Sequence, residues 1–143
     1  MAHGEEDAMN VFIVDLVNQP GQLAKISEAI ARKGINITGI SGVTCGGSGA
    51  VALLTNDEPG TRKAFEDAGI RARELELVTT SIEDKPGTLA AVTKKLSDAG
   101  INIEAAMPVG MTAGKVSLAF ATDKPQKARE ILGAGERTGV GVG

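Results

Sequence analysis

Aromatic side chains are nearly missing from this 143-residue chain, which contains three Phe and no Trp or Tyr. A hydrophobic core must therefore be built from Ile, Val, Leu and Ala, with Phe12, Phe65 and Phe120 as its only rings. The chain also lacks a basic excess, since its net charge is −3 and its isoelectric point lies near 5.2. Because sheets that bind RNA need stacking aromatics and a basic face, the composition argues against a nucleic-acid partner.

Cysteine, histidine and long apolar runs are equally scarce, and each shortage excludes a class of function. Cys45 is the only cysteine, so no internal disulfide can form, and His3 is the only histidine, so a catalytic triad or a histidine metal cluster cannot be assembled. The acidic start "MAHGEEDAMN" lacks the features of a signal peptide, and no apolar run is long enough to span a bilayer. We expect a cytoplasmic protein with no membrane segment, metal or cofactor.

The chain contains one twenty-residue stretch twice. The first copy, "NQPGQLAKISEAIARKGINI", begins at Asn18, and the second, "DKPGTLAAVTKKLSDAGINI", begins at Asp84, an offset of 66 positions. The same offset, continued without a gap, places Asp57 on Asp123. A repeat of this length indicates a domain duplication. The domains that we expect are a flexible N-terminus at 1–9, a first domain at 10–76, and a second domain at 77–143 that ends in a glycine-rich tail.

The hydrophobic periodicity changes in the same order within each copy. In the first, a run rich in β-branched residues predicts a strand, and apolar residues three and four apart, from Leu23 to Ile30, predict an amphipathic helix that ends at Gly34. The expected elements are strands at 10–17, 35–43, 50–55 and 70–76 with helices at 20–34 and 58–69, then strands at 77–82, 101–109 and 115–121 with helices at 86–99 and 125–132.

The order β-α-β-β-α-β predicts an α+β fold of two tandem ferredoxin-like sandwiches, each with a four-stranded antiparallel sheet and two helices on one face. No loop separates 70–76 from 77–82, so the two sheets should be adjacent, through separate strands or one long bent strand. The tail at 133–143 is a poor final strand because five of its eleven residues are glycine. Units of this size bury little apolar surface and leave sheet edges exposed, so we predict a homodimer.

The Pro-Gly pair at the entrance of each repeat has two interpretations. Asn18, Asp84 and the prolines are all typical of turns and first helical turns, so the motif can serve folding alone. Alternatively, the free backbone N–H groups and positive partial charge of a helix N-terminus bind a carboxylate, with glycine allowing close approach. The expected donors are the amides of Gly21, Gln22 and Leu23 in the first copy and of Gly87, Thr88 and Leu89 in the second.

The exit of each repeat, Gly-Ile-Asn-Ile, can likewise serve folding alone or bind a ligand. Asn36 and Asn102 occupy strand positions that disfavour asparagine. Each can stabilise the turn between helix and strand, or its amide can hold the ammonium and carboxylate of a bound amino acid. Asp84 can add a negative charge for the ammonium in the second copy, whereas Asn18 can add only a carbonyl in the first, so the two sites need not be equal.

Together, these two motifs resemble the ACT domain, the small regulatory module of amino-acid metabolism. The resemblance covers about residues 11–132 as two tandem copies, and it implies the β-α-β-β-α-β sandwich and side-by-side association. It also implies that an amino acid binds at the interface between domains, between the first strand-to-helix loop and the second strand. The residues that it indicates are Asn18, Gln19, Gly21, Gln22, Leu23, Asn36 and Ile37, and Asp84, Lys85, Gly87, Thr88, Leu89, Asn102 and Ile103.

The sequence thus predicts a non-catalytic protein that senses a small amino acid and modulates a partner enzyme in trans, since no enzyme domain is recognisable in the chain. The main alternative is a module that only dimerises or docks onto a biosynthetic enzyme as its regulatory subunit, without a ligand. A third and weaker alternative is an enzyme that uses Cys45.

Overall fold

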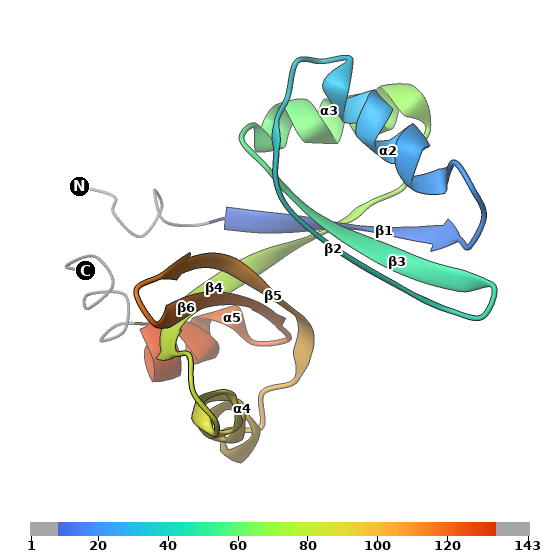
Figure 1. Ribbon diagram of the computed structural model, residues 1–143. Helices are drawn as coiled ribbons and strands as arrows, with labels where there is room; N and C mark the ends of the chain where they lie inside the picture. The colour runs from blue at the N-terminus through green and yellow to red at the C-terminus, as the bar shows by residue number, and fades with distance from the viewer. Residues whose placement is uncertain (1–8, 134–143) are drawn as a thin grey trace. The chain divides into compact units, whose positions relative to one another are not determined.

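The computed structural model describes residues 9–133, in which strands alternate with helices (Figure 1). The elements in chain order are β1 (Met9–Val17), α2 (Gln22–Ala31), β2 (Ile37–Cys45), β3 (Ser48–Thr55), α3 (Glu58–Ala68), β4 (Arg73–Glu83), α4 (Thr88–Asp98), β5 (Ile103–Thr112), β6 (Lys115–Thr122), α5 (Pro125–Ala128) and the π-helical turn η1 (Arg129–Gly133). Paired strands run antiparallel, so the fold is α+β. Within these residues, no helix has the length and apolar character needed to cross a membrane.

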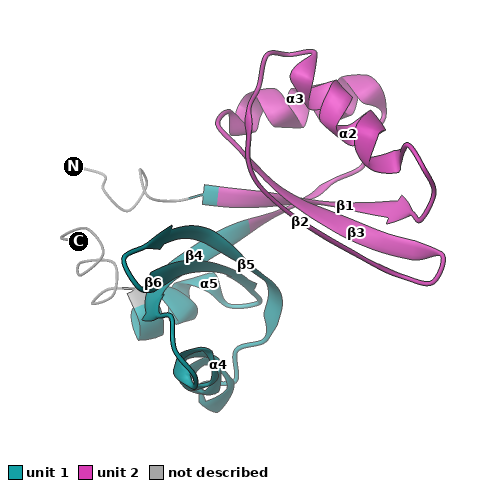
Figure 2. Cartoon of the chain, in the orientation of Figure 1, with its two compact units in different colours: residues 1–9, 76–143 teal, residues 10–75 magenta. Residues whose placement is uncertain are grey.

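The chain divides into two compact units along strand β4 (Figure 2). One unit comprises residues 10–75, with strands in the order β2-β3-β1 and the start of β4. The other contains residues 76–133, with strands in the order β4-β6-β5. β4 is continuous from Arg73 to Glu83, so one strand replaces the two expected at 70–76 and 77–82. The fourth strand expected for the second copy lies in the tail, outside the described residues.

In the first unit, α2 and α3 lie on one face of the sheet formed by β1, β3 and β2 (Figure 1). Phe12 of β1 lies opposite Leu53 of β3, and both side chains are buried. Phe65 of α3 packs edge-on against Phe12, with ring centroids 5.9 Å apart, and Ile30 of α2 joins the same cluster. The predicted helix and strand faces therefore meet in one core.

The second unit builds a corresponding core with the aromatic ring on the other strand. Val78 of β4 lies opposite Phe120 of β6, which reverses the arrangement of Phe12 and Leu53. Leu96 of α4 packs into this cluster. Each of these cross-strand pairs thus combines one aromatic ring with one aliphatic side chain.

Backbone pairing at the end of each repeat shows that the second hairpin is one residue longer. In the first copy, Asn36 N–H donates to Asn56 Oδ1 and Asn56 N–H donates to Asn36 O, both at 3.1 Å. In the second, Asn102 N–H donates to Asp123 Oδ1 at 2.9 Å and receives Asp123 N–H on its carbonyl at 3.1 Å. Asp123 therefore corresponds to Asn56, and not to Asp57 as the constant offset predicts. The extra residue lies in β5, whose register with β6 shifts twice, whereas β2 shifts once against β3.

The Pro-Gly pairs precede their helices instead of opening them. α2 begins at Gln22, and its N-cap residue Gly21 has φ 91° and ψ −10°. Gln22 N–H donates to Gln19 O at 3.4 Å, so these residues form a type II turn whose third position requires positive φ. Gly87 has φ 92° before α4. The turn alone therefore accounts for both glycines, whether or not a ligand approaches them.

Candidate functional site

A cleft of about 470 Å³ opens between the β1–α2 loop and the β2–β3 hairpin of the first unit. Its volume is in the range of small-molecule sites in proteins. Four of the residues that the sequence predicts as ligand contacts line it: Asn18, Gln19, Gln22 and Leu23. The remaining lining residues are Leu16, Val17, Ile40, Ser41, Gly42, Val43, Thr44, Ala50 and Val51. This set contains polar and apolar side chains but no acidic or basic one.

Large apolar side chains are exposed around this cleft. Val17 and Ile40 are each 51% exposed, Leu23 is 46% exposed and Val43 is 73% exposed. Ile40 and Val43 lie on β2, an edge strand, and their odd spacing places them on opposite faces. Sequence reasoning missed these two residues, although apolar side chains on both faces of a short strand are a signal for contact with another surface.

Asn18 is held against the hairpin turn by two hydrogen bonds. Its backbone N–H donates to Gly47 O at 2.9 Å, and its side-chain Nδ2 donates to Gly46 O at 3.0 Å. Because a carbonyl can only accept, the amide nitrogen must face Gly46 and Oδ1 is the atom left to accept from another donor. The loop is therefore fixed, with one acceptor of Asn18 still available at the cleft.

The start of α2 offers backbone N–H donors at the same cleft. It has no side-chain cap and no acidic residue in its first turn, unlike α3, where Asp57 Oδ1 accepts Gly60 N–H at 3.0 Å. The first helical bond runs from Lys25 N–H to Gly21 O at 3.0 Å, so Leu23 N–H has no partner among the turn and cap bonds of the described residues. Free amides at a helix start favour an anion.

The predicted contacts at the exit of the repeats lie away from this cleft. Asn36 is exposed and is not among the lining residues. Its N–H donates to the Asn56 side chain, and its carbonyl accepts the Asn56 N–H. Ile37 packs against the first core, and Ile103 packs against the second. The first copy therefore brings four entrance residues together at this cleft, and Asn36 and Ile37 are not among its lining residues.

The entrance of the second copy is charged and internally bonded. Glu83 and Lys85 form an ion pair at 2.8 Å, which lowers the pKa of the Glu83 carboxyl and raises the pKa of the Lys85 ammonium. Thr88 Oγ1 donates to Glu83 O at 2.6 Å, with Lys85 O as a second acceptor at 3.0 Å. Leu89 is 52% exposed, like Leu23 in the first copy. Asp84 N–H donates to Gly114 O at 2.8 Å, as Asn18 does to its own hairpin.

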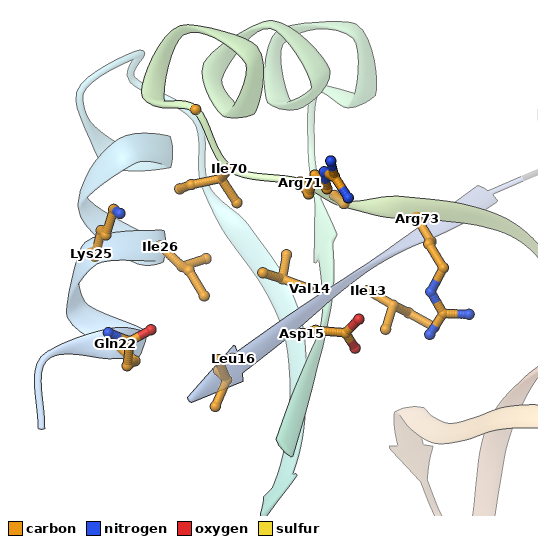
Figure 3. Close-up of a pocket in the computed structure, with 12 residues that line it drawn as sticks. Ile13, Val14, Asp15, Leu16, Gln22, Lys25, Ile26, Ile70, Arg71 and Arg73 are labelled. Carbon is orange, nitrogen blue, oxygen red and sulfur yellow. The ribbon is translucent and has the colours of Figure 1, made fainter. Parts of the chain in front are cut away.

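A larger cleft of about 570 Å³ follows β1 between α2 and the segment 69–73, which leads into β4 (Figure 3). Ile26 and Ile70 point toward Val14 in its apolar part (Figure 3). Its charged lining residues are Asp15, Lys25, Arg71 and Arg73. Gln22 is the only predicted contact that lines it. These two clefts thus differ in the charge of their lining residues, since one has no charged side chain and the other has a basic excess.

The described residues do not support metal or thiol chemistry at either cleft. They contain no group of three or more His, Cys, Asp or Glu side chains placed to hold a metal ion. Cys45 is exposed at the end of β2 and lines neither cleft, so nothing couples its thiol to a binding site.

The family model of the ACT domain matches residues 10–67 of the chain. The comparison with curated proteins finds no match. Among solved structures, protein BT0572 from Bacteroides thetaiotaomicron is similar with a TM-score of 0.73 and 22% identity, over 87% of this chain and 85% of that one.

Two further structures have the same fold. The regulatory subunit of aspartate kinase from Thermus thermophilus, in its ligand-free form, has a TM-score of 0.59 and 20% identity, over 87% of this chain and 89% of that one. The corresponding subunit from Thermus flavus has a TM-score of 0.60 and 20% identity, over 87% and 90%. At these identities the likeness establishes the fold alone.

Proposed function

We propose that the chain is an ACT-domain protein, as the match of its residues 10–67 to the family model supports, and that it is a non-catalytic regulatory protein that binds a small amino acid. Two structures with the same fold are regulatory subunits of aspartate kinase, which supports a role in the control of amino-acid metabolism. In this proposal the chain consists of two tandem ACT-like domains with four-stranded sheets, at 10–76 and 77–143. Ligand occupancy acts on a partner enzyme in trans.

The observation that carries this proposal is the uncapped start of α2 at an open, uncharged cleft. The α-carboxylate of the ligand accepts from Leu23 N–H, and its ammonium donates to Asn18 Oδ1. A zwitterion matches this pairing of donors and acceptor without a charged side chain. The other proposed contacts are Gln19, Gly21, Gln22, Asn36 and Ile37 in the first copy, and Asp84, Lys85, Gly87, Thr88, Leu89, Asn102 and Ile103 in the second.

We propose that the protein is a homodimer and that strand β2 forms its contact. β2 is an edge strand with Ile40 and Val43 exposed beside the cleft. Burial of each such side chain stabilises an association by about 1.5–3 kcal/mol. A second copy placed along this edge covers the cleft as well, so ligand binding and the arrangement of the dimer become linked. The ligand shifts that arrangement only if it prefers one packing over the other.

The same exposed edge favours a second candidate, a module that docks onto a partner without any ligand. Ile40 and Val43 serve such docking equally well, because an apolar edge binds any complementary surface. The two candidates differ in one respect: only the first predicts that free amino acids stabilise the protein.

A thermal-shift screen with the twenty common amino acids at millimolar concentration tests this difference. A ligand that binds only the native state raises the melting temperature by mass action. For the amino acid that binds, Asn18→Ala should weaken binding by roughly 1–3 kcal/mol, because it removes a buried hydrogen bond to a charged group. Asn36→Ala and Asn102→Ala test the exit residues in the same way, and Lys94→Ala on the exposed face of α4 is the control. No shift with any amino acid would favour the docking module.

A further inference from the structure

The lining of the 470 Å³ cleft restricts the side chain of its ligand. None of its thirteen residues is charged. A charged ligand side chain that enters the cleft loses water without gaining a counter-charge, which is unfavourable. Leu23 and Ile40 instead offer apolar surface on the α2 side of the sheet that an aliphatic side chain covers on binding. The lining of the cleft therefore favours an aliphatic ligand side chain over a charged one.

The strand register identifies the corresponding loop positions in the second copy. Val17 pairs with Ser48 at the end of β1, and Glu83 pairs with Lys115 at the end of β4, so Glu83 takes the place of Val17. By the repeat alignment, Lys85 takes the place of Gln19. This copy therefore has the Glu83–Lys85 ion pair where the first has two uncharged side chains.

The edge strands β2 and β5 also differ in the side chains that they carry at equivalent positions. Ile40 pairs with Leu53, and the corresponding Ala106 pairs with Phe120. Val43 is replaced by Gly110 in the same register. At these two positions the second copy has a methyl group and a hydrogen atom, and its exposed apolar side chain on β5 is Met111, at the position of Thr44.

From these differences we propose that only the first copy binds the ligand, and that the ligand is an amino acid with an uncharged aliphatic side chain. This inference rests on the proposed function and names the ligand class and the copy that binds it. It keeps the proposed contacts of the first copy and withdraws those of the second, which are Asp84, Lys85, Gly87, Thr88, Leu89, Asn102 and Ile103. The second copy serves as a structural partner, with its entrance loop bound to itself through the ion pair and the Thr88 hydroxyl.

Isothermal titration calorimetry of the full chain tests the ligand class. L-valine, L-leucine, L-isoleucine, L-aspartate and L-lysine are each titrated into the protein under the same conditions, and their affinities are compared. We expect one site per chain and an affinity for the charged amino acids that is at least about tenfold weaker. L-alanine should also bind about tenfold or more weakly than L-valine, because each lost methylene removes apolar contact.

Exchange of residues between the copies tests which copy binds. Val17→Glu introduces the charge of the second copy at the end of β1, beside the cleft, and it should weaken binding of the aliphatic ligand by at least about tenfold. The matched variant Glu83→Val removes that charge from the second copy and should leave the affinity unchanged. Both positions are about half exposed, so neither variant threatens the fold.

Each outcome bears on a different part of the proposal. Two sites per chain, or loss of binding in Glu83→Val with Val17→Glu unaffected, would overturn the assignment to the first copy. Equal affinity for L-aspartate or L-lysine would overturn the ligand class and leave amino-acid sensing intact. If no amino acid binds, the proposed function fails and this inference fails with it.

Discussion

Strands β2 and β5 occupy the same place in the two copies, each at the outer end of its strand order, but they present different surfaces. β2 exposes Ile40 and Val43, whereas β5 exposes Met111 and carries Pro108 and two register shifts against its neighbour. Proline cannot donate a backbone hydrogen bond, and bulges distort an edge, so both features discourage pairing with another strand. The two edges therefore differ in how readily they would pair with another strand, and β5 is the less suited of the two.

The two cores differ at one buried position in a similar way. Val14 on β1 pairs with Val51, and the corresponding Thr80 on β4 pairs with Leu118. Thr80 is buried, and its hydroxyl has no hydrogen-bond partner among the described residues. An unpaired buried hydroxyl opposes folding, so the second copy is less well adapted to its core at this position.

The largest effects should come from the two aromatic residues that exchange strands. Phe12→Ala and Phe120→Ala should each lower the free energy of unfolding by about 3–5 kcal/mol, because both rings are buried and their removal leaves a cavity. Urea denaturation measures the loss, with Met111→Ala as the exposed control. If Phe120→Ala costs no more than that control, the second core is not organised around this ring.

The comparison of edge strands predicts the next largest effect. Val43→Lys should raise the dissociation constant of the dimer at least about tenfold, because it removes apolar contact and places a charge at the association edge. Gly110→Lys is the matched change on β5, where an added Cβ meets no atom within 4 Å, and it should leave association unchanged. Analytical ultracentrifugation measures both. A monomeric wild-type protein, or equal effects of the two variants, would refute the role of β2.

Replacing Val14 by Thr and Thr80 by Val should change the free energy of unfolding by a smaller amount, with opposite signs in the two variants. Thr80→Val should raise the free energy of unfolding by about 1–2 kcal/mol, because it removes an unsatisfied buried hydroxyl. Val14→Thr should lower it by a similar amount. Thermal and urea denaturation check both signs, and a destabilised Thr80→Val protein would show that this hydroxyl does have a partner.

The smallest expected effect is the pH dependence of the stability that Asp123 contributes at the junction between helix and strand in the second copy. Asp123 accepts the N–H of Asn102 and lies beside Lys124, and both interactions lower the pKa of its carboxyl. A carboxyl with a lowered folded pKa stabilises the fold above its ordinary pKa, near 3.9, and this contribution is lost as the pH falls through the folded value. Asn56 accepts the equivalent N–H in the first copy with an amide, which does not titrate.

NMR spectroscopy distinguishes these two junctions. Between pH 6 and 2, the backbone amide signal of Asn102 should shift with a midpoint below about 3.9, and that of Asn36 should not follow the same curve. Asp123→Asn should abolish the shift. A midpoint above the ordinary value, or an unchanged titration in the variant, would contradict the assigned hydrogen bond.

Periodicity and turn residues were sufficient to predict the order of the strands and helices and most of the core. Phe12, Ile30 and Leu53 lie where their spacing indicates, because burial of one face dominates the choice between helix and strand. The constant offset failed at Asp123, because an added residue in β5 and a shorter connection before Pro125 cancel in the sequence. Such compensation leaves no trace in a gap-free alignment, and only the strand register reveals it.

The candidate site could be predicted in part. Asn18, Gln22 and Leu23 followed from the chemistry of a helix entrance, which is local in the sequence. Ile40 and Val43 did not, because they reach the cleft through the pairing of β2 with β3, and that pairing is a tertiary contact. Their exposure on an edge strand becomes visible only once the strand order is known.

Strand β4 limits how the chain can be divided for study. A cut between residues 75 and 76 falls inside an eleven-residue strand that pairs with β6 through Leu77–Glu83. At its other end, Glu74 is bound by Arg62 at 2.6 Å within the first unit. Fragments that are expressed separately should therefore both contain Arg73–Glu83, and a reporter or tag inserted within this stretch would interrupt the pairing of β4 with β6.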